Sequence, residues 1–384
     1  MNVDLKDSVT DIYFRFIQFS LGIYEGKEFL DGSALKDFDW SAFYGFAKKQ
    51  TLVGVVFDGI RKLPKGYAPS FHLLMQWVAV SQKIKQSNNV LNEATVAIYN
   101  MVKAAGFPCC ILKGQGNAVM YPDPTARIPG DVDVWVDASR EEIRALASSL
   151  AQKTNGNVDD EGLNHIGLTM NGITVELHFT PGFMANFVYN RRLQRWLKQN
   201  VGLQCSNMVE LPNGAGIAAI PTHSFNIVYQ LYHLYHHYFY EGVGLRQVLD
   251  YYFVLVKSET GRDSSVLERE LKHLGMWKFA GAMMFVLNHV MGLEESKMIA
   301  PVDRGRGQML LDDILNGGNF GHYDERHAWG RDSYDGKGFK HGALGHNLLR
   351  LYRDLRLLKF YPAEALSEPV FRVWHYFWRM KNNK

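Results

Sequence analysis

The stretch Asp131-Val-Asp-Val-Trp-Val136 decides the fold and the chemistry that we expect of this chain. Side chains alternate between the two faces of a strand, so Asp131 and Asp133 share one face with Trp135 while the valines share the other. This alternation predicts a half-buried strand with an acidic face. Two neighbouring carboxylates can bind hard divalent cations, and a paired-metal site is a common means of moving a phosphoryl or nucleotidyl group. Taken alone, an Asp-x-Asp is also common on solvated strand edges.

A second acidic strand is expected at 173–179, where the odd positions are apolar. Glu176 and His178 therefore share the opposite face. If this strand lies beside the first, Glu176 is a third carboxylate on the acidic face and can act as a metal ligand or as a general base. His178 can orient Glu176 or contact a phosphate, and a surface histidine is an equally good interpretation.

Phosphate-binding groups are expected at the end of the first short apolar run, 109–112. Lys113-Gly114 follows it, and a glycine allows the tight turn into a helix that starts near Gln115. Exposed amides at such a start attract phosphate, and a lysine adds charge. Arg127, just ahead of Asp131, is placed to contact a phosphate or to pair with an acidic neighbour, or it is a plain surface arginine.

The order of the patterns predicts an α+β protein with a small mixed β-sheet flanked by N-terminal and C-terminal helical regions. Strands are expected at 109–112, 132–136, 165–170 and 173–179, with Asn171-Gly172 as the turn of a hairpin and a capped helix at 138–154. Further helices are expected from Pro221, at 245–256 and at 276–291, and a loop at 301–345. We divide the chain into a helical region 1–100, a core 101–215, a helical domain 216–300 and a last region 301–384.

These motifs resemble those of the uncharacterised nucleotidyltransferase family in the DNA polymerase beta-like superfamily, over roughly residues 40–290. The matching residues are Ile111-Leu-Lys-Gly114, Tyr121-Pro-Asp-Pro124, Arg127, Asp131-Val-Asp133 and Val175-Glu-Leu-His178, followed by His233, His236, His237, Leu245-Arg246 and Asp250. The resemblance implies a nucleotidyltransferase core in which Asp131 and Asp133 bind two magnesium ions, Glu176 is the third acidic residue and the turn at Gly114 holds the triphosphate. Lysine and glycine replace the usual glycine–serine step here, and the gap to the aspartates is longer than usual.

A histidine-rich helix is expected after Pro221. His233 and His237 are four residues apart and share a face, as zinc ligands do, although no glutamate or cysteine completes such a site. The alternatives are an aromatic helix that packs on the core, or histidines that line the cleft and contact base, ribose or acceptor. Arg246 and Asp250 have the same spacing and predict an exposed ion pair within one helix, unless Arg246 contacts the nucleotide.

Composition limits the class of protein. The 384 residues carry a net charge of +3, and 47% of them are hydrophobic, which indicates packed cores and no dedicated nucleic-acid binder. Three cysteines without metal-ligand spacing predict reduced, buried thiols. The acidic start and the lack of a long apolar run predict a cytoplasmic protein without a transmembrane segment. The basic and aromatic stretch 350–379 fits a surface for acidic lipid or RNA, or more simply a helix that covers apolar surface.

The sequence therefore predicts a magnesium-dependent nucleotidyltransferase, with two Mg²⁺ or Mn²⁺ ions and a nucleoside triphosphate as substrate. The acceptor is a small molecule, a protein or an RNA. The alternative is a catalytically silent module that binds nucleotide or metal and regulates a partner.

Overall fold

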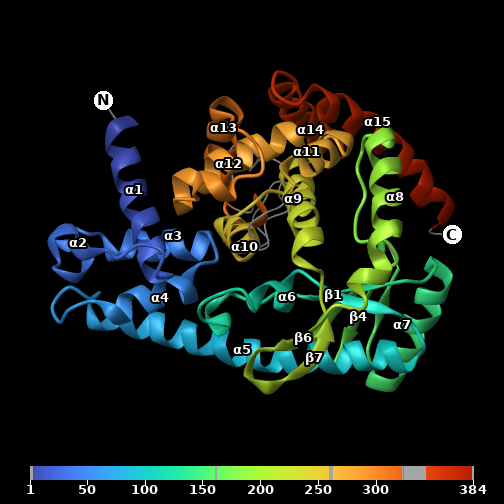
Figure 1. Ribbon diagram of the computed structural model, residues 1–384, viewed down its shortest axis with the longest axis horizontal. Coiled ribbons are helices and arrows are strands. Elements are labelled where there is room, and N and C mark those ends of the chain that lie inside the picture. Colours follow the sequence, from blue (N-terminus) through green and yellow to red (C-terminus); the bar gives the residue numbers. More distant parts are fainter. Residues whose placement is uncertain (1–2, 161, 259–262, 322, 324–342, 383–384) are drawn as a thin grey trace.

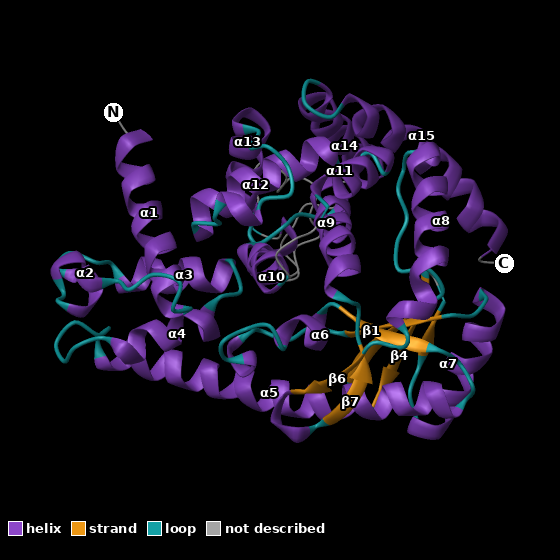
Figure 2. Ribbon diagram, viewed as in Figure 1, coloured by secondary structure: helices purple, strands orange, loops and turns teal. Residues whose placement is uncertain are grey.

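The computed structural model describes residues 3–160, 162–258, 263–321, 323 and 343–382 (Figure 1). Helices surround one small sheet and a separate two-stranded hairpin (Figure 2). The N-terminal helices lie at one end of the molecule, and the C-terminal helices lie above the sheet (Figure 1). The predicted α+β class is confirmed.

The larger sheet has the strand order β1-β2-β5-β4-β3. Its strands are β1 Cys109–Leu112, β2 Val132–Val136, β3 Val158–Asp159, β4 His165–Met170 and β5 Ile173–His178. Only the β2–β5 pairing is parallel, and the other pairs are antiparallel. The sheet is therefore mixed, as the sequence predicts, and it places the two acidic strands side by side.

The hairpin between β4 and β5 has the predicted turn. Asn171 and Gly172 both have positive φ angles, 50° and 80°. A two-residue turn with this backbone matches the twist of the strands that it joins. Met170 pairs with Ile173, and this fixes the register back to the pair His165 and His178.

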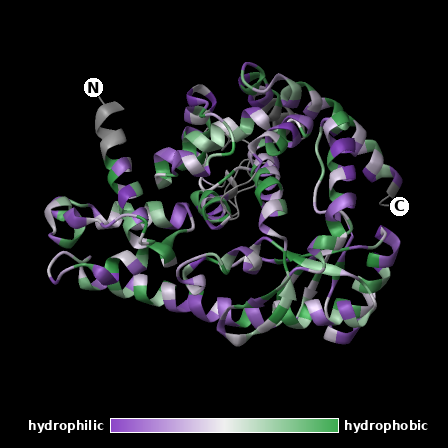
Figure 3. Ribbon diagram, viewed as in Figure 1, coloured by the Kyte–Doolittle hydropathy of each residue, from purple (hydrophilic) through white to green (hydrophobic). Residues whose placement is uncertain are grey.

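Strand β2 is buried more completely than its alternation predicts. All five of its residues are buried, where we expected one half-exposed face. The polar-side residue Trp135 is covered by Phe225, whose ring stacks on it at 5.7 Å. Figure 3 colours this central part of the sheet mostly as hydrophobic. The acidic face is therefore the wall of an interior site and not an outer surface.

The expected helical region before residue 105 is confirmed. It contains α1 Val3–Ser20, α2 Lys27–Leu30, α3 Trp40–Lys49, α4 Val53–Lys62 and α5 Phe71–Ala104. The long helix α5 buries Trp77, Ile84, Leu91 and Ile98, which recur every seven residues on one face. It runs beneath the sheet (Figure 1) and contacts β1 and β2. This packing gives the small sheet a continuous floor.

Two helices of the core differ in how well the sequence reveals them. Helix α7 Arg140–Thr154 has the expected N-terminal cap, since Ser139 and Glu142 form a capping box. Helix α8 Phe187–Gln204 was not anticipated, although Asn186 caps it by accepting from the amides of Val188 and Tyr189. A short helix, α6 Gly114–Ala118, follows β1, and the hairpin β6 Met208–Leu211 and β7 Gly216–Ala219 precedes the C-terminal half.

The C-terminal half is helical. Its helices are α9 His223–Tyr240, α10 Leu245–Lys257, α11 Ser264–His273, α12 Trp277–Met291, α13 Arg304–Gly317, α14 Ala343–Leu358 and α15 Pro362–Asn382. Short 3-10 turns lie at Ser33–Leu35, Pro124–Ala126, Pro212–Gly214, Glu295–Lys297 and Asn319–Gly321. The starts expected after Pro221 and near residues 245 and 276 are confirmed.

The loop expected at 301–345 is wrong where the structure describes it, because α13 occupies part of it. Asp303 caps this helix by accepting from the amide of Arg306, and Leu310 and Ile314 are buried. Gly307 lies against Phe285, and a Cβ there would come within 2.3 Å of that side chain. The glycines that suggested a loop therefore permit close helix packing. Asn319–Gly321 forms a 3-10 turn and α14 begins at Ala343, while residues 322 and 324–342 of the expected loop lie outside the described residues.

The cysteines are as predicted. Cys109, Cys110 and Cys205 are buried and none forms a disulfide. Within the described ranges, we find no helix with both the length and the apolar character that crossing a bilayer requires.

Candidate active site

Three carboxylates meet at the end of strands β2 and β5. Because these strands are parallel, Asp133 lies directly opposite Glu176, and Asp131 directly precedes β2. Oxygen atoms of Asp131, Asp133 and Glu176 all lie within 4.8 Å of one another. Three groups that are distant in the sequence therefore form one acidic cluster in space, in the arrangement that suits a divalent cation.

Lys113 lies against this cluster from the end of β1. Leu112 pairs with Asp133 across the sheet, and the Lys113 Nζ atom lies 2.9 Å from Oδ1 of Asp133. Lys113 has φ 47° and ψ −138°, a strained backbone for a residue with a side chain. Gly114 also has a positive φ, 33°, and a Cβ on it would lie 3.5 Å from the carbonyl oxygen of Asp131. The turn thus places the ammonium group of Lys113 and the backbone of Gly114, which has no side chain, next to the carboxylates.

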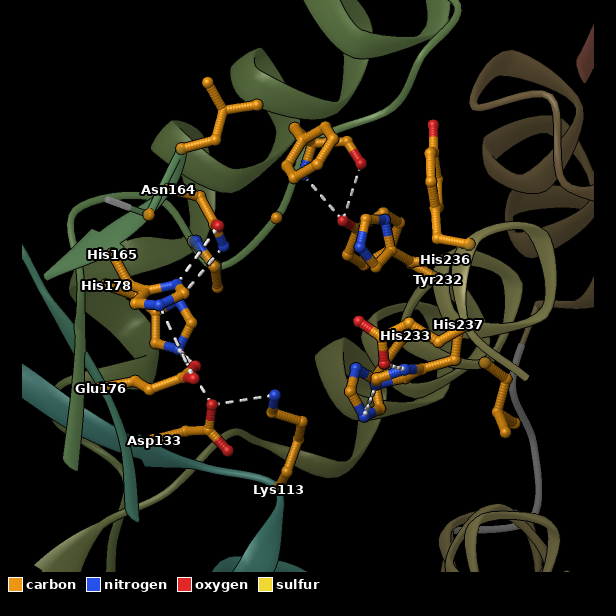
Figure 4. A pocket seen from close by; sticks show the side chains of 18 of the residues that line it. Lys113, Asp133, Asn164, His165, Glu176, His178, Tyr232, His233, His236 and His237 are labelled. Carbon is orange, nitrogen blue, oxygen red and sulfur yellow. Dashed lines mark hydrogen bonds and ion pairs between the residues drawn. The ribbon is translucent and has the colours of Figure 1, made fainter. Parts of the chain in front are cut away.

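His178 lies against the carboxylates and is only 3% exposed. Its Nε2 atom lies 2.9 Å from Oδ1 of Asp133 and 3.2 Å from Oε2 of Glu176 (Figure 4). Burial alone would lower the pKa of His178, but these contacts with Asp133 and Glu176 raise it above its ordinary value. The interpretation as a surface histidine is therefore wrong, and His178 bridges two acidic side chains.

The sequence analysis missed two neighbours of the cluster, Asn164 and His165. The Nε2 atom of His165 lies 3.6 Å from Oε1 of Glu176. The amide of Asn164 lies between the two imidazoles, with its oxygen 3.3 Å from Nδ1 of His165 and its nitrogen 3.3 Å from Nδ1 of His178. The Asn171-Gly172 turn could have identified His165, since counting back from it pairs positions 165 and 178.

The two aspartates have opposite electrostatic character. Repulsion by Asp133, together with burial, raises the pKa of Asp131 to about 6. Burial also acts to raise the pKa of Asp133, but Lys113 and His178 hold it well below its ordinary value. Asp133 is thus paired directly with Lys113 and His178, whereas Asp131 is only partly compensated by the charge of Lys113.

Arg127 does not point at the carboxylates. It is buried and makes a bidentate pair with Asp250, with Nε 2.8 Å from Oδ1 and Nη2 2.8 Å from Oδ2. The hydroxyl of Tyr121 donates to the same carboxylate at 2.7 Å. The exposed pair expected between Arg246 and Asp250 is therefore wrong, because Asp250 is buried and bonds Arg127. Arg246 instead donates from Nη1 to the carbonyl oxygen of Ile128 at 2.9 Å.

The histidines of α9 form the wall opposite the carboxylates (Figure 4). The Nε2 atoms of His233 and His237 lie 3.1 Å apart, and Nδ1 of His237 lies 2.7 Å from Oε2 of Glu241. Burial lowers the pKa of His233 well below its ordinary value and that of His236 to about 3, so both are neutral. Of the alternatives for these histidines, the geometry favours a cleft lining, because no third metal ligand joins His233 and His237 within the part of the chain that the structure describes.

One pocket of about 710 Å³ joins the two walls. Lys113, Gly114 and the three carboxylates line one side, and α9 and Arg246 line the other. Helices α14 and α15 close a third side with Arg353, Arg372, His375 and Arg379, which belong to the basic stretch 350–379 but were not predicted to line a pocket. The buried Nε of Arg246 and Nε2 of His375 have no hydrogen-bond partner among the described residues. The volume suits a ligand of nucleotide size, and these nitrogens are donors or acceptors for it.

One comparison with known proteins identifies the family of the chain. No curated protein matches the sequence. Among solved structures, an antigenic nucleotidyltransferase-like protein from Paracoccidioides brasiliensis is similar with 14% identity and a TM-score of 0.35, covering 59% of this chain and 98% of that one. A likeness this weak carries no argument about function. Residues 36–292, by contrast, match a family described as uncharacterised nucleotidyltransferase, and they include the three carboxylates, the Lys113 turn and the α9 histidines. The chain belongs to this nucleotidyltransferase family.

Proposed function

We propose that the chain is a divalent-cation-dependent nucleotidyltransferase, which moves a nucleoside monophosphate from a nucleoside triphosphate to a hydroxyl or amine acceptor. The observation that carries the proposal is the meeting of Asp131, Asp133 and Glu176 at one end of a parallel strand pair, within a pocket of nucleotide size. Membership of the family supports the same reaction class.

The acidic cluster fits the expected cations. Its donor atoms are carboxylate oxygens, which hard divalent ions prefer, and Asp131 is exposed to the pocket. Asp131, Asp133 and Glu176 would hold two Mg²⁺ ions, or Mn²⁺ in their place, which would neutralise the phosphates and polarise the reacting oxygens. The repulsion of Asp131 by Asp133 and Glu176 is what such a cation would reduce.

The residues around the cluster position the substrates. Lys113 and the backbone at Gly114 bind the phosphates of the nucleotide. The oxygen or nitrogen atom of the acceptor attacks the α-phosphorus in line, and Glu176 accepts the proton that this atom loses. A new bond to phosphorus forms, the bond from the α-phosphorus to the bridging oxygen breaks, and pyrophosphate leaves with that electron pair. Most of the rate enhancement then comes from positioning and charge neutralisation.

The opposite wall selects the ligand. His233, which burial keeps neutral, and His237 face the carboxylates across the pocket, so they contact base, ribose or acceptor. Arg246 adds a positive group on the same side, with its Nε free of hydrogen bonds within the described chain. Arg127 also lines the pocket, but Nε and Nη2 of its guanidinium are held by Asp250. His178 holds Asp133 and Glu176 in place from behind.

A catalytically silent binding module is a second candidate. The Lys113 ammonium and the His178 imidazole both contact Oδ1 of Asp133, so one ligand position is filled by the protein itself. A chain that kept these contacts with nucleotide bound would bind without transfer.

The test combines calorimetry with each nucleoside triphosphate and Mg²⁺ and an assay of pyrophosphate release with cell extract as the source of acceptor. We expect binding, and release that depends on the acceptor. Asp131→Asn should abolish release without lowering the melting temperature, whereas Asp137→Asn, an exposed aspartate at the other end of β2, should behave as wild type. Full release by Asp131→Asn would refute the proposal. Tight binding without release from the wild type would favour the silent module.

A further inference from the structure

Helix α15 exposes an apolar face to solvent and turns several polar side chains inward. Its polar side chains Glu368, Arg372 and His375 face inward and line the pocket. Its outer face carries Leu366, Val370, Val373, Phe377 and Met380, which are 54–65% exposed. The interpretation that this stretch covers apolar surface is confirmed for the inward face, where Phe371 is buried and stacks on Phe183, and the outer face is apolar as well.

The exposed side chains form one continuous stripe. They follow one another at intervals of four and three residues, so they lie on successive turns of the same helix face. Five large side chains, each more than half exposed, make a patch on the order of 500 Å², near the upper end for monomeric soluble proteins. Trp374 and Tyr376 flank the stripe and are 42% and 62% exposed. A patch of this size marks an interaction surface.

The charges around the stripe have one sign. From residue 351 to residue 381, the exposed charged side chains are Lys359, Arg379 and Lys381, and all are basic. Lys359 lies just before the helix and Lys381 in its last turn, so positive charge lies at both ends of the stripe. The acidic residues of the same segment face inward. Asp354 and Glu368 are buried and contact Arg372, and Glu364 accepts from the hydroxyl of Tyr235 at 2.9 Å.

Helix α15 lies at the rim of the molecule, beside α8 (Figure 1). The side chain of Asn186 donates to Ser367 at 3.0 Å, and Phe187 contacts Trp374 edge-on at 6.1 Å. Phe187 and Val188 are 48% and 60% exposed and extend the apolar surface beyond the helix. Nothing among the described residues lies over the stripe.

We propose that the outer face of α15 docks on an anionic lipid surface. An apolar stripe with aromatic flanks and an entirely basic exposed charge is the pattern of a helix that lies in the plane of a membrane interface. The apolar side chains would insert among the acyl chains, and Lys359 and Lys381 would contact the anionic headgroups. A partner protein with an acidic rim would have to pack closely against the same stripe. A second copy of the chain would also bring the basic residues of both copies close together.

The test is co-sedimentation of the full chain with phosphatidylcholine vesicles and with vesicles that contain phosphatidylglycerol. We expect at least tenfold stronger binding to the anionic vesicles, and weaker binding in high salt. Phe377→Asp should lower the binding at least tenfold, while Phe71→Asp, which changes a 79% exposed phenylalanine at the start of α5, should leave it unchanged. The double variant Lys359→Glu with Lys381→Glu should lose the preference for anionic lipid.

Two outcomes would overturn the proposal. One is wild-type binding that is absent or equal for both kinds of vesicle. The other is a dimer in light scattering that Phe377→Asp converts to a monomer, because a second copy would then cover the stripe. If Phe377→Asp does not fold, the insertion of α15 into the membrane can be tested on the folded wild type by quenching of its tryptophan fluorescence with brominated lipid. Wild type should be quenched, and Trp374→Phe should lose most of that quenching.

Discussion

Asp250→Asn should destabilise the protein strongly, although Asp250 lies outside the acidic cluster. The pair that it makes with Arg127 is bidentate, and the two residues are 5% and 3% exposed. Removing the negative charge leaves a buried guanidinium without a counter-charge, and breaking such a pair costs about 3 to 5 kcal/mol. With a urea dependence of about 3 kcal/mol per M, the unfolding midpoint should fall by about 1 M or more.

The assay is urea unfolding followed by circular dichroism, with a double-mutant cycle. Replacing both partners, Arg127→Met with Asp250→Leu, should recover most of the loss, because no isolated charge remains buried. Glu268→Gln breaks the exposed pair with Lys272 and should cost less than about 1 kcal/mol. An unchanged midpoint for Asp250→Asn, together with weakened nucleotide binding, would refute the reasoning and return Arg127 to the phosphate site.

Three other predictions concern the pocket. Burial lowers the pKa of His236 to about 3, so between pH 6.5 and 3 only the unfolded chain binds a proton at this residue. The free energy of unfolding should therefore decrease as the pH is lowered, by about 2 kcal/mol at pH 5. His236→Phe should flatten this pH dependence in urea unfolding. The pKa of Asp131 is raised to about 6, so the folded chain binds this proton more tightly than the unfolded chain does. The contribution of Asp131 to the free energy of unfolding therefore decreases as the pH rises from 4 to 6. Because Asp131 is mostly protonated at pH 5, Mg²⁺ should raise the melting temperature at pH 7.5 but not at pH 5. Lys113→Met should weaken triphosphate binding in calorimetry at least tenfold while nucleoside binding changes little.

The sequence could predict the parts of the site that lie on regular strands. Alternation in β2 and β5 gives the faces of Asp133, Glu176 and His178, and the Asn171-Gly172 turn fixes the register of the neighbouring strand. What it could not give is the parallel pairing of β2 with β5, which depends on packing between segments some 40 residues apart. From the sequence, the meeting of the three carboxylates was therefore only a hypothesis, and the strand pairing in the structure is needed to establish it.

Burial explains the errors about charged residues. Arg246 and Asp250 have the spacing of a helical ion pair, which is worth only a few tenths of a kcal/mol at a surface. Asp250 instead bonds a guanidinium 123 positions away, since inside the protein a bidentate partner is needed to offset desolvation. Nothing in the local sequence distinguishes these cases. The missed helices are different, because the caps at Asn186 and Asp303 were readable.

The lysine in the turn before the acidic strand has a physical rationale under the proposed function. Three carboxylates within 4.8 Å repel one another, as the raised pKa of Asp131 indicates. A serine hydroxyl could bind a phosphate but could not reduce this repulsion, whereas the ammonium of Lys113 does so through its contact with Asp133. With a cation held by the carboxylates, the Lys113 ammonium would lie beside the phosphates with its charge available for them. The strained backbone of Lys113 keeps it within reach of both partners, so one residue can stabilise the empty site and bind the ligand of the filled one.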